Sequence, residues 1–474
     1  MHVASFWAEG WKGRSALRIF WRGHYSAESR VRSPNNDRSS ARAGAFSKMS
    51  KSKAEASWFP WVAGAGAAFA VYEIVRLRAE VAALKGGGVA SAPPASAGPS
   101  EDAQVKRAPV VVQADNLRVA VRAIVRAGGS SETEAAAVAG NLVLSNLKGH
   151  DSHGVGYLPR YINGVKSGRI TLDAVAKVIS ETPTTILLDG GIGFGQTLGG
   201  QAMAAGIPKA LEHGVAVVSM RNSHHLARIG AWAEQCADAG LVSIHFTNVA
   251  GHCPLVAPHL GADARLGTNP FTVGFPGPNG EHIILDYATS EQALGKVREA
   301  KARGEPVPDG VLLDKHGMPT NDSRCLPPND GALLPFCGHK GYALALMCEV
   351  LGGAMTGGYT IEPSHPRDAS MIVNSMTSFI LNPAQLTGSS DGLGSIHAEM
   401  ARLFTYVTAS PLRPGADPAK AIIVPGQYER NVMAKRSKEG IPVAAGTYDQ
   451  LRDAAQKVGI EEHDFTAMMQ GTTK

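Results

Sequence analysis

Residues 149–161 (GHDSHGVGYLPRY) concentrate side chains that can transfer protons or bind anions. The stretch holds two histidines, an aspartate, a serine, two tyrosines and an arginine among three glycines. We expect a helix over residues 130–147 to end just before it, which gathers these polar groups at a helix terminus and turn. Polar side chains on a loop held by rigid elements are typical of functional sites. The alternative is a helix C-terminus followed by a solvated turn.

This stretch contains two short motifs, HDSHGV at 150–155 and LPRY at 158–161. Further motifs follow it along the chain: NSHH at 222–225, GTNP at 267–270, DYATS at 286–290 and GHKGY at 338–342. Together and in this order they resemble the malate/L-lactate dehydrogenase family that does not use a Rossmann fold. The resemblance covers roughly residues 110 to 470. It implies oxidation of 2-hydroxy acids, or reduction of 2-oxo or 2-imino acids, with NAD or NADP, by a homodimer.

The fold that the resemblance implies is mixed α/β. Its cofactor-binding sheet is largely antiparallel and non-Rossmann, with a helical region built from the two ends of the chain. The glycine run at residues 190–195 (GGIGFG) lies between a predicted strand and a predicted helix. Its spacing does not match GxGxxG, and no acidic residue ends a clean second strand about twenty residues later. We therefore predict a turn there rather than a dinucleotide fingerprint.

His225 is the predicted acid/base of the reaction. Oxidation of a secondary alcohol needs a base for the hydroxyl proton, and a histidine pKa lies near neutrality. His225 follows a predicted strand and starts a predicted helix, whose N-terminus favours the neutral imidazole. The resemblance assigns this role to the histidine that closes the NSHH motif. The alternative is a structural histidine, and His224 has no clear role.

Arginines near these motifs are candidates for holding the substrate carboxylate. Arg228 lies three residues after His225, so a helical turn would bring both to one side, where a guanidinium can bind a carboxylate through two parallel bonds. Many family members carry an arginine where this chain has Tyr157. Arg228 or Arg160 could replace it, and Tyr161 matches a family position that contacts substrate. The alternative for Arg228 is a surface arginine.

The resemblance also assigns residues to the cofactor. Ser152 and His153 match a pair that lines the nicotinamide and substrate pocket, and both are predicted to take part in catalysis. A lysine at a helix start makes an anion site for a pyrophosphate or 2′-phosphate. The predicted cofactor contacts are His153, Asn248, Asp286, Ala288, Thr289, His339, Lys340 and Gly341. An alternative for Asp286 is the N-cap of the helix that follows it.

A metal site is the alternative use of the histidines. His150 and His153 are three residues apart, and His224, His225 or His252 could complete a zinc site. No HExxH motif or cysteine pair supports it. We therefore predict no metal, and a metal-dependent hydrolase is the least favoured function.

Composition sets the broad class. The 474 residues contain 44% hydrophobic and 18% charged residues, which is typical of soluble globular proteins. The net charge of +5 comes largely from the first eighty residues, so no nucleic-acid partner is implied. The five scattered cysteines indicate reduced thiols in a reducing compartment.

The N-terminal part divides by composition. Residues 1–53 are rich in arginine and serine, which suits a mitochondrial or other organellar transit peptide, or else a disordered tail or a start at Met49. Residues 54–84 include an apolar stretch at 58–72, short for the roughly 20 residues of a membrane span, so any membrane association would be weak. A cytoplasmic, possibly tethered protein is the alternative. Residues 85–108 are a flexible linker.

The catalytic body is predicted to span residues 109–474. Residues 109–190 and 420–474 should form the helical, terminal part, and residues 191–419 the cofactor and substrate part. Hydrophobic periodicity predicts these elements. Strands are expected at 215–219, 241–247, 271–275, 282–285 and 421–424, with two within 175–189 and one within 365–387. Helices are expected over 114–147, 229–239, 292–304, 341–355 and, last, 448–458, whereas 399–410 fits either type.

We therefore predict an NAD(P)-dependent 2-hydroxyacid dehydrogenase acting on a malate- or lactate-like acid. The main alternative is an NAD(P)H-dependent reductase of a cyclic imino acid on the same scaffold. A third possibility, a membrane-tethered protein without catalysis, conflicts with the intact motifs.

Overall fold

The computed structural model describes residues 107–472 apart from 328–329, 366–370 and 388–391. The predicted targeting segment, the apolar stretch at 58–72 and nearly all of the linker therefore lie outside the described residues. Among the helices within the described ranges, none is both long and apolar enough to cross a membrane.

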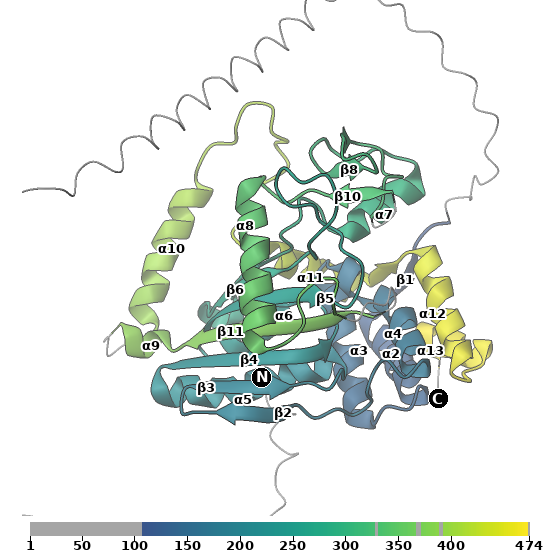
Figure 1. The fold of residues 1–474 in the computed structure, drawn as a ribbon, viewed down its shortest axis with the longest axis horizontal. Coiled ribbons are helices and arrows are strands. Elements are labelled where there is room, and N and C mark those ends of the chain that lie inside the picture. Colours follow the sequence, from purple (N-terminus) through teal and green to yellow (C-terminus); the bar gives the residue numbers. More distant parts are fainter. Residues whose placement is uncertain (1–106, 328–329, 366–370, 388–391, 473–474) are drawn as a thin grey trace, which may run out of the picture. The chain divides into compact units, whose positions relative to one another are not determined.

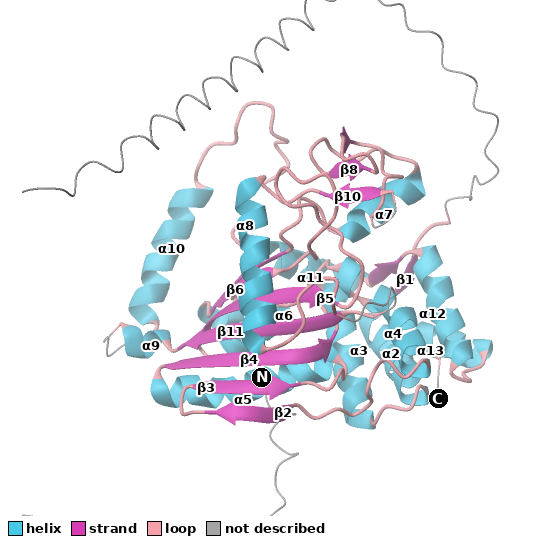
Figure 2. Cartoon of the chain, in the orientation of Figure 1, coloured by secondary structure: helices cyan, strands magenta, loops and turns pink. Residues whose placement is uncertain are grey.

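A seven-stranded sheet forms the centre of the described chain (Figures 1 and 2). Its strand order is β2-β3-β4-β11-β5-β6-β7. The bounds are β2 Lys177–Glu181, β3 Thr185–Asp189, β4 Val215–His224, β5 Val242–Ala250, β6 Phe271–Phe275, β7 Ile283–Tyr287 and β11 Val373–Leu381. Every neighbouring pair is antiparallel except β3 and β4. The predicted mixed, largely antiparallel, non-Rossmann sheet is confirmed.

Helices α5 (Gly195–His213) and α6 (Gly230–Asp238) bury one face of this sheet. Their apolar side chains share a core with those of β3, β4 and β11, including Met376. Thr377, the next residue along β11, instead donates a hydrogen bond to Leu351 O, 2.7 Å away. Since successive strand residues point to opposite faces, α8 (His339–Cys348) and the π-helical turn after it cover the other face. Figure 1 shows α8 crossing the strands.

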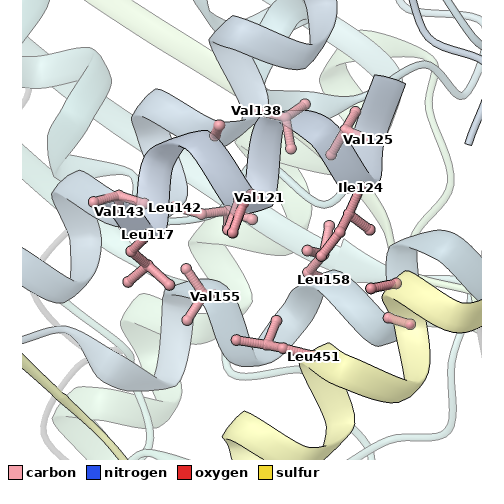
Figure 3. Packing of buried hydrophobic residues seen from close by; sticks show 14 of the residues in the cluster. Leu117, Val121, Ile124, Val125, Val138, Leu142, Val143, Val155, Leu158 and Leu451 are labelled. Atoms are coloured by element: carbon pink, nitrogen blue, oxygen red, sulfur yellow. The ribbon is translucent and has the colours of Figure 1, made fainter. Parts of the chain in front are cut away.

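The second layer is helical and draws on both ends of the body. It comprises α2 (Ala114–Ala127), α3 (Glu132–Leu147), α4 (Leu158–Lys166), α12 (Ala445–Lys457) and α13 (Glu462–Gln470), with β1 (Val110–Val112) paired to β12 (Ile441–Val443). Leu117, Leu142, Leu158 and Leu451 pack together in one core (Figure 3). Ser131 caps α3 by accepting the Glu134 backbone N–H at 3.2 Å.

Two sequence predictions are wrong in detail. The strand expected at 421–424 is not a strand, because no neighbouring strand pairs with it, and Ile423 stays exposed. The helix expected to be last is followed by α13. The ambiguous segment at 399–410 lies largely in helix α10 (Gly394–Thr408).

The remaining elements are short or peripheral. A small sheet of order β10-β8-β9 is formed by residues 312–333. The bounds are β8 Leu312–Asp314, β9 Pro319–Thr320, β10 Gly331–Leu333, α7 Leu294–Arg303, α9 Pro383–Leu386 and α11 Gln427–Glu439.

The packing of α5 on α6 generates a stability prediction. A Cβ at Gly199 would lie 2.4 Å from Trp232 Cε2, inside van der Waals contact. We expect Gly199→Ala to lower the free energy of unfolding by about 1–3 kcal/mol, measured by urea denaturation. The control is Gly140→Ala in α3, where an added Cβ meets nothing within 4 Å, so that variant should gain up to about 1 kcal/mol. Equal stability of the two variants would contradict this packing.

Candidate active site

Two predicted motifs meet in a cluster of rings at the seam between the helical layer and the sheet. His225, just past the end of β4, stacks on Tyr157 with ring centroids 4.3 Å apart and on His153 at 5.7 Å. Tyr161 of α4 completes this group, which we call the ring cluster, with its hydroxyl 2.7 Å from His225 Nδ1. The sequence placed these residues in separate motifs, and the fold brings them into contact.

Close backbone packing fixes His225. A Cβ on Gly195, the first residue of α5, would lie 2.2 Å from the His225 carbonyl oxygen, so only glycine allows this approach. On the other side, the Leu226 N–H donates to Asn374 Oδ1 of β11 at 2.8 Å. The ring of His225 is therefore presented from a rigid segment between helix and sheet.

Burial keeps the histidines of the site neutral. It lowers the pKa of His153 to about 4 and that of His224 to about 3, and holds the pKa of His225 well below its ordinary value. The predicted cause was different, since we expected a helix N-terminus at His225. Helix α6 begins only at Gly230, and residues 225–228 are not helical. Desolvation, and not a helix terminus, therefore disfavours the imidazolium of His225.

Ser152 lies beside His153, with its hydroxyl oxygen 3.0 Å from His153 Nδ1. Helix α7 approaches from the other side, since a Cβ on Gly295 would lie 2.9 Å from Ser152 Cβ. The pair therefore sits between the ring cluster and the start of α7. Arg160 is half-buried, and its charge contributes to the low pKa of His225.

Arg228 is buried rather than on the surface. Its Nη2 bonds Glu234 Oε2 at 2.6 Å, and Lys148 Nζ reaches the same oxygen at 2.7 Å. The premise that a helical turn brings Arg228 beside His225 is wrong, because residues 225–228 are not helical. Arg228 Nη1 is nevertheless buried without a hydrogen-bond partner in the part of the chain that the structure describes. Such a donor is costly unless something binds it.

The predicted cofactor residues of the sheet make internal bonds. Asp286 accepts the Gly230 N–H and the Thr272 hydroxyl, each at 2.7 Å, so it caps α6 rather than the helix that follows it in sequence. Thr289 donates to Thr268 O at 3.0 Å. Ala288 is half-buried next to them. Their contact with a cofactor stays a prediction.

Asn248 is fully buried and ties three segments together. It donates to Tyr359 O at 2.7 Å and accepts the Ser375 N–H at 3.1 Å. It also donates to Glu349, a buried carboxyl whose pKa burial raises. Both the amide nitrogen and the amide oxygen of this side chain are therefore hydrogen-bonded within the protein.

The start of α8 has the features of an anion site. His339, Lys340 and Gly341 open the helix as predicted, and no side chain caps it. Lys340 is exposed, and Gly341 packs so tightly on Phe336 O that an added Cβ would lie 2.2 Å away. A helix start that carries an exposed ammonium suits a phosphate group. These residues fit the diphosphate of a dinucleotide.

The first two residues of the HDSHGV motif have structural partners. His150 Nε2 lies 3.0 Å from Glu429 Oε1, and Asp151 is bound through both carboxylate oxygens by Arg436. Both pairs attach α11 to the end of α3. Within the described ranges, no three His, Cys, Asp or Glu side chains group to hold a metal ion.

Gln196 is a residue of the site that the sequence did not reveal. It lies in the first turn of α5, is almost fully buried, and its Nε2 donates to the Tyr161 hydroxyl at 2.9 Å. A glutamine after a glycine-rich turn carries no motif. Its only sequence signal was its place at the predicted start of a helix.

Neutral imidazoles beside aromatic rings, with a buried unpaired guanidinium nitrogen close by, suit proton transfer to and from a small organic acid. The fold and this site thus define an α/β protein with a mixed, non-Rossmann sheet and a buried histidine centre suited to acid/base chemistry.

The chain belongs to the malate/L-lactate dehydrogenase family, whose model matches residues 112–452. It is 44% identical over 359 residues to hydroxycarboxylate dehydrogenase B of Escherichia coli K12, covering 75% of this chain and 97% of that protein. A solved Escherichia coli structure assigned to the malate/lactate dehydrogenases matches with a TM-score of 0.73 and 43% identity over 77% of this chain and all of that one.

A second solved structure, delta1-piperideine-2-carboxylate reductase from Pseudomonas syringae, matches with a TM-score of 0.63 and 30% identity over 73% of this chain and all of that one. The family and these relatives make this chain a hydroxyacid dehydrogenase-type oxidoreductase.

The buried histidines predict how stability depends on pH. The pKa of His153 and that of His245, which lies between two serines of the sheet, fall to about 4 and about 3 in the folded protein, whereas an exposed histidine titrates near 6.5. Between these pH values the unfolded chain binds more protons, so stability rises with pH. We expect the Tm to fall as pH drops from about 6.5 toward 4.

A pH series of calorimetric scans measures this effect. His245→Gln should flatten the slope, because it removes one of the groups that take up a proton on unfolding. A Tm that stays level or rises as the pH drops from 6.5 to 5 would contradict the burial of these rings as neutral groups.

Proposed function

We propose that this enzyme transfers a hydride between NAD(P) and a 2-hydroxy acid or its 2-oxo partner, with His225 as the acid/base. The observation that carries the proposal is the ring cluster: His225 is buried, neutral and bonded through Nδ1 to Tyr161. That bond leaves Nε2 for the substrate. A general base must be neutral to accept a proton, and this one is.

The proton moves from the substrate to His225 in oxidation and from His225 to the substrate in reduction. In oxidation, His225 Nε2 takes the proton of the substrate hydroxyl as the C2–H bond breaks. The nicotinamide, when bound, supplies the hydride acceptor. In reduction, the imidazolium returns the proton to the forming alkoxide. A bound substrate carboxylate would favour the imidazolium by its charge, which offsets the desolvation that otherwise disfavours it.

Arg228 is the best supported holder of the substrate carboxylate. Its buried Nη1 lacks a partner among the described residues, and its charge, like that of Asp286, acts on His153. A carboxylate oxygen at this nitrogen would satisfy it at once. Arg160, half-buried near the same rings, is the second cation of the site. Tyr157, in the position where many family members carry arginine, stacks on His225 instead.

The cofactor would be held by two groups of residues. Lys340 and the uncapped start of α8 suit the diphosphate. Ser152 and His153, between the ring cluster and α7, suit the nicotinamide end. Dehydrogenases of this family depend on pyridine nucleotides, which supports the assignment to NAD or NADP.

A cyclic imino acid reductase is the second candidate. The similarity to a delta1-piperideine-2-carboxylate reductase favours it. Both reactions use the same proton and hydride steps at C2, so the ring cluster serves either. A cyclic imine and a linear 2-oxo acid, offered in parallel with the same reduced cofactor, separate the two functions.

We propose in addition that the active unit is a homodimer formed through α8 and α10. Helix α10 has no buried residue and lies apart from the sheet in Figure 1. Such a helix is marginal in water unless its apolar side packs on something. Leu346 of α8 and Val350 of the π-helical turn after it are also exposed, and both line a cavity of about 570 Å³. A second copy of the chain would cover both apolar surfaces.

Tyr406, which is 81% exposed on α10, tests this surface. Tyr406→Glu should shift the protein from dimer to monomer in sedimentation velocity, because a charge would be buried in the contact. Leu260→Glu is the control, since Leu260 is 93% exposed on a loop outside α8 and α10. A dimer that survives Tyr406→Glu would place the contact elsewhere.

The acid/base role predicts that His225→Ala lowers turnover by about 10²-fold or more, with cofactor binding nearly unchanged. His213→Ala, at the exposed end of α5, is the matched control and should keep wild-type turnover. Steady-state rates and NAD(P)H fluorescence titration measure the two effects. Wild-type turnover in His225→Ala, with a loss in His153→Ala, would move the role to His153.

A further inference from the structure

Tyr161 connects His225, the proposed acid/base, to Gln196, which has no assigned role. Its hydroxyl lies 2.7 Å from His225 Nδ1 and 2.9 Å from Gln196 Nε2. All three side chains are buried, and Tyr161 is 0% exposed. No water competes for these bonds at the surface, so the three groups must satisfy one another.

The chain constrains the proton on His225. When His225 takes a proton at Nε2, both ring nitrogens carry hydrogen, and Nδ1–H can only donate to the Tyr161 oxygen. A phenolic hydroxyl accepts such a bond while keeping its own proton. Burial raises the pKa of Tyr161, so the hydroxyl stays protonated throughout. Tyr161 therefore supports the imidazolium without ionising.

Gln196 completes the arrangement. An amide offers both a donor and an acceptor, so it can bond to the Tyr161 oxygen or receive the Tyr161 proton. Gln196 Oε1 is buried and has no partner among the described residues, which leaves it free for that second arrangement. Because Nδ1 carries hydrogen in both protonation states of a histidine whose Nε2 takes the proton, the Tyr161 oxygen accepts from His225 in each state, and Gln196 Oε1 can take the Tyr161 proton.

We propose that Tyr161 and Gln196 are positioning residues, which hold His225 with Nδ1 toward the protein and Nε2 toward the substrate and stabilise its imidazolium. This inference rests on the proposed function. In oxidation the hydroxyl proton moves to Nε2 and the hydride to the nicotinamide, while the Nδ1 proton stays in its bond to Tyr161. No proton leaves Tyr161 or Gln196.

The pH dependence of reduction is the sensitive readout, because reduction needs protonated His225. The titratable and charged groups that face or act on His225 are His153, Tyr157, Arg160, Tyr161, His224 and His252. Removal of the Tyr161 oxygen disfavours the imidazolium and lowers its pKa in the ternary complex. The rate of 2-oxo acid reduction should then decline at lower pH than in the wild type.

The test is Tyr161→Phe, which keeps the ring that packs edge-on against Phe194. We expect kcat to fall at least about 10-fold, the cofactor KM to stay, and the alkaline decline of the reduction rate to move down by about one pH unit. Tyr448→Phe removes the same atom in the helical layer, where Tyr448 packs on Phe465, and should change neither.

Gln196→Met is a second variant in case Tyr161→Phe does not fold. It keeps the length of the side chain and should give a smaller shift in the same direction. Wild-type kcat in both variants, or a lower kcat with no movement of the pH profile, overturns the inference. If the wild-type enzyme reduces neither a 2-oxo acid nor a cyclic imine, the proposed function itself fails instead.

Discussion

The site depends on keeping one titratable ring away from water between two apolar cores. Tyr161 and Phe194 belong to the core of the helical layer, whereas Leu226, next to His225, belongs to that of the sheet. His225 lies where these cores meet. On folding, its ring loses contact with solvent and gains contact with aromatic rings and one hydroxyl. Burial disfavours its charged form, so the resting enzyme holds a neutral base. In the proposed function, a bound substrate carboxylate would offset this cost, which would link the proton step to substrate binding.

The architecture follows from that constraint. The helical layer that carries His153, Tyr157 and Tyr161 is made from residues near both ends of the described chain, so α12 packs against α4 and α13 packs against α2. The sheet delivers His225 and, through Asp286, fixes the first turn of α6 behind it. Small residues permit the approach: Gly195 admits the His225 carbonyl, and Gly154 lies where a Cβ would meet Asn146 Oδ1 at 2.1 Å. A larger side chain at either position would clash with these neighbours.

Much of this could be predicted from the sequence, because the signals were local. Apolar runs predicted β4 and β6, and the HDSHGV and NSHH motifs contain residues that meet in the ring cluster. The remainder depends on pairs distant in the chain. Gln196 lies 35 residues from Tyr161, and Asp286 lies 56 residues from the N–H that it accepts. No periodicity encodes such pairs. Arg228 and its partner Glu234 are close in the chain, but residues 225–228 do not form the helical turn that was expected there.

The central claim is that this ring cluster moves a proton while a nicotinamide moves a hydride at C2 of a small acid. The most direct measurement is NAD(P)H absorbance with the purified full-length chain, a panel of 2-oxo acids and a cyclic imino acid, and each reduced cofactor in turn. Oxidation of NADH or NADPH that depends on one of these acids is the predicted result, and it identifies the cofactor at the same time. A folded protein that leaves both cofactors unoxidised across the whole panel would contradict the account.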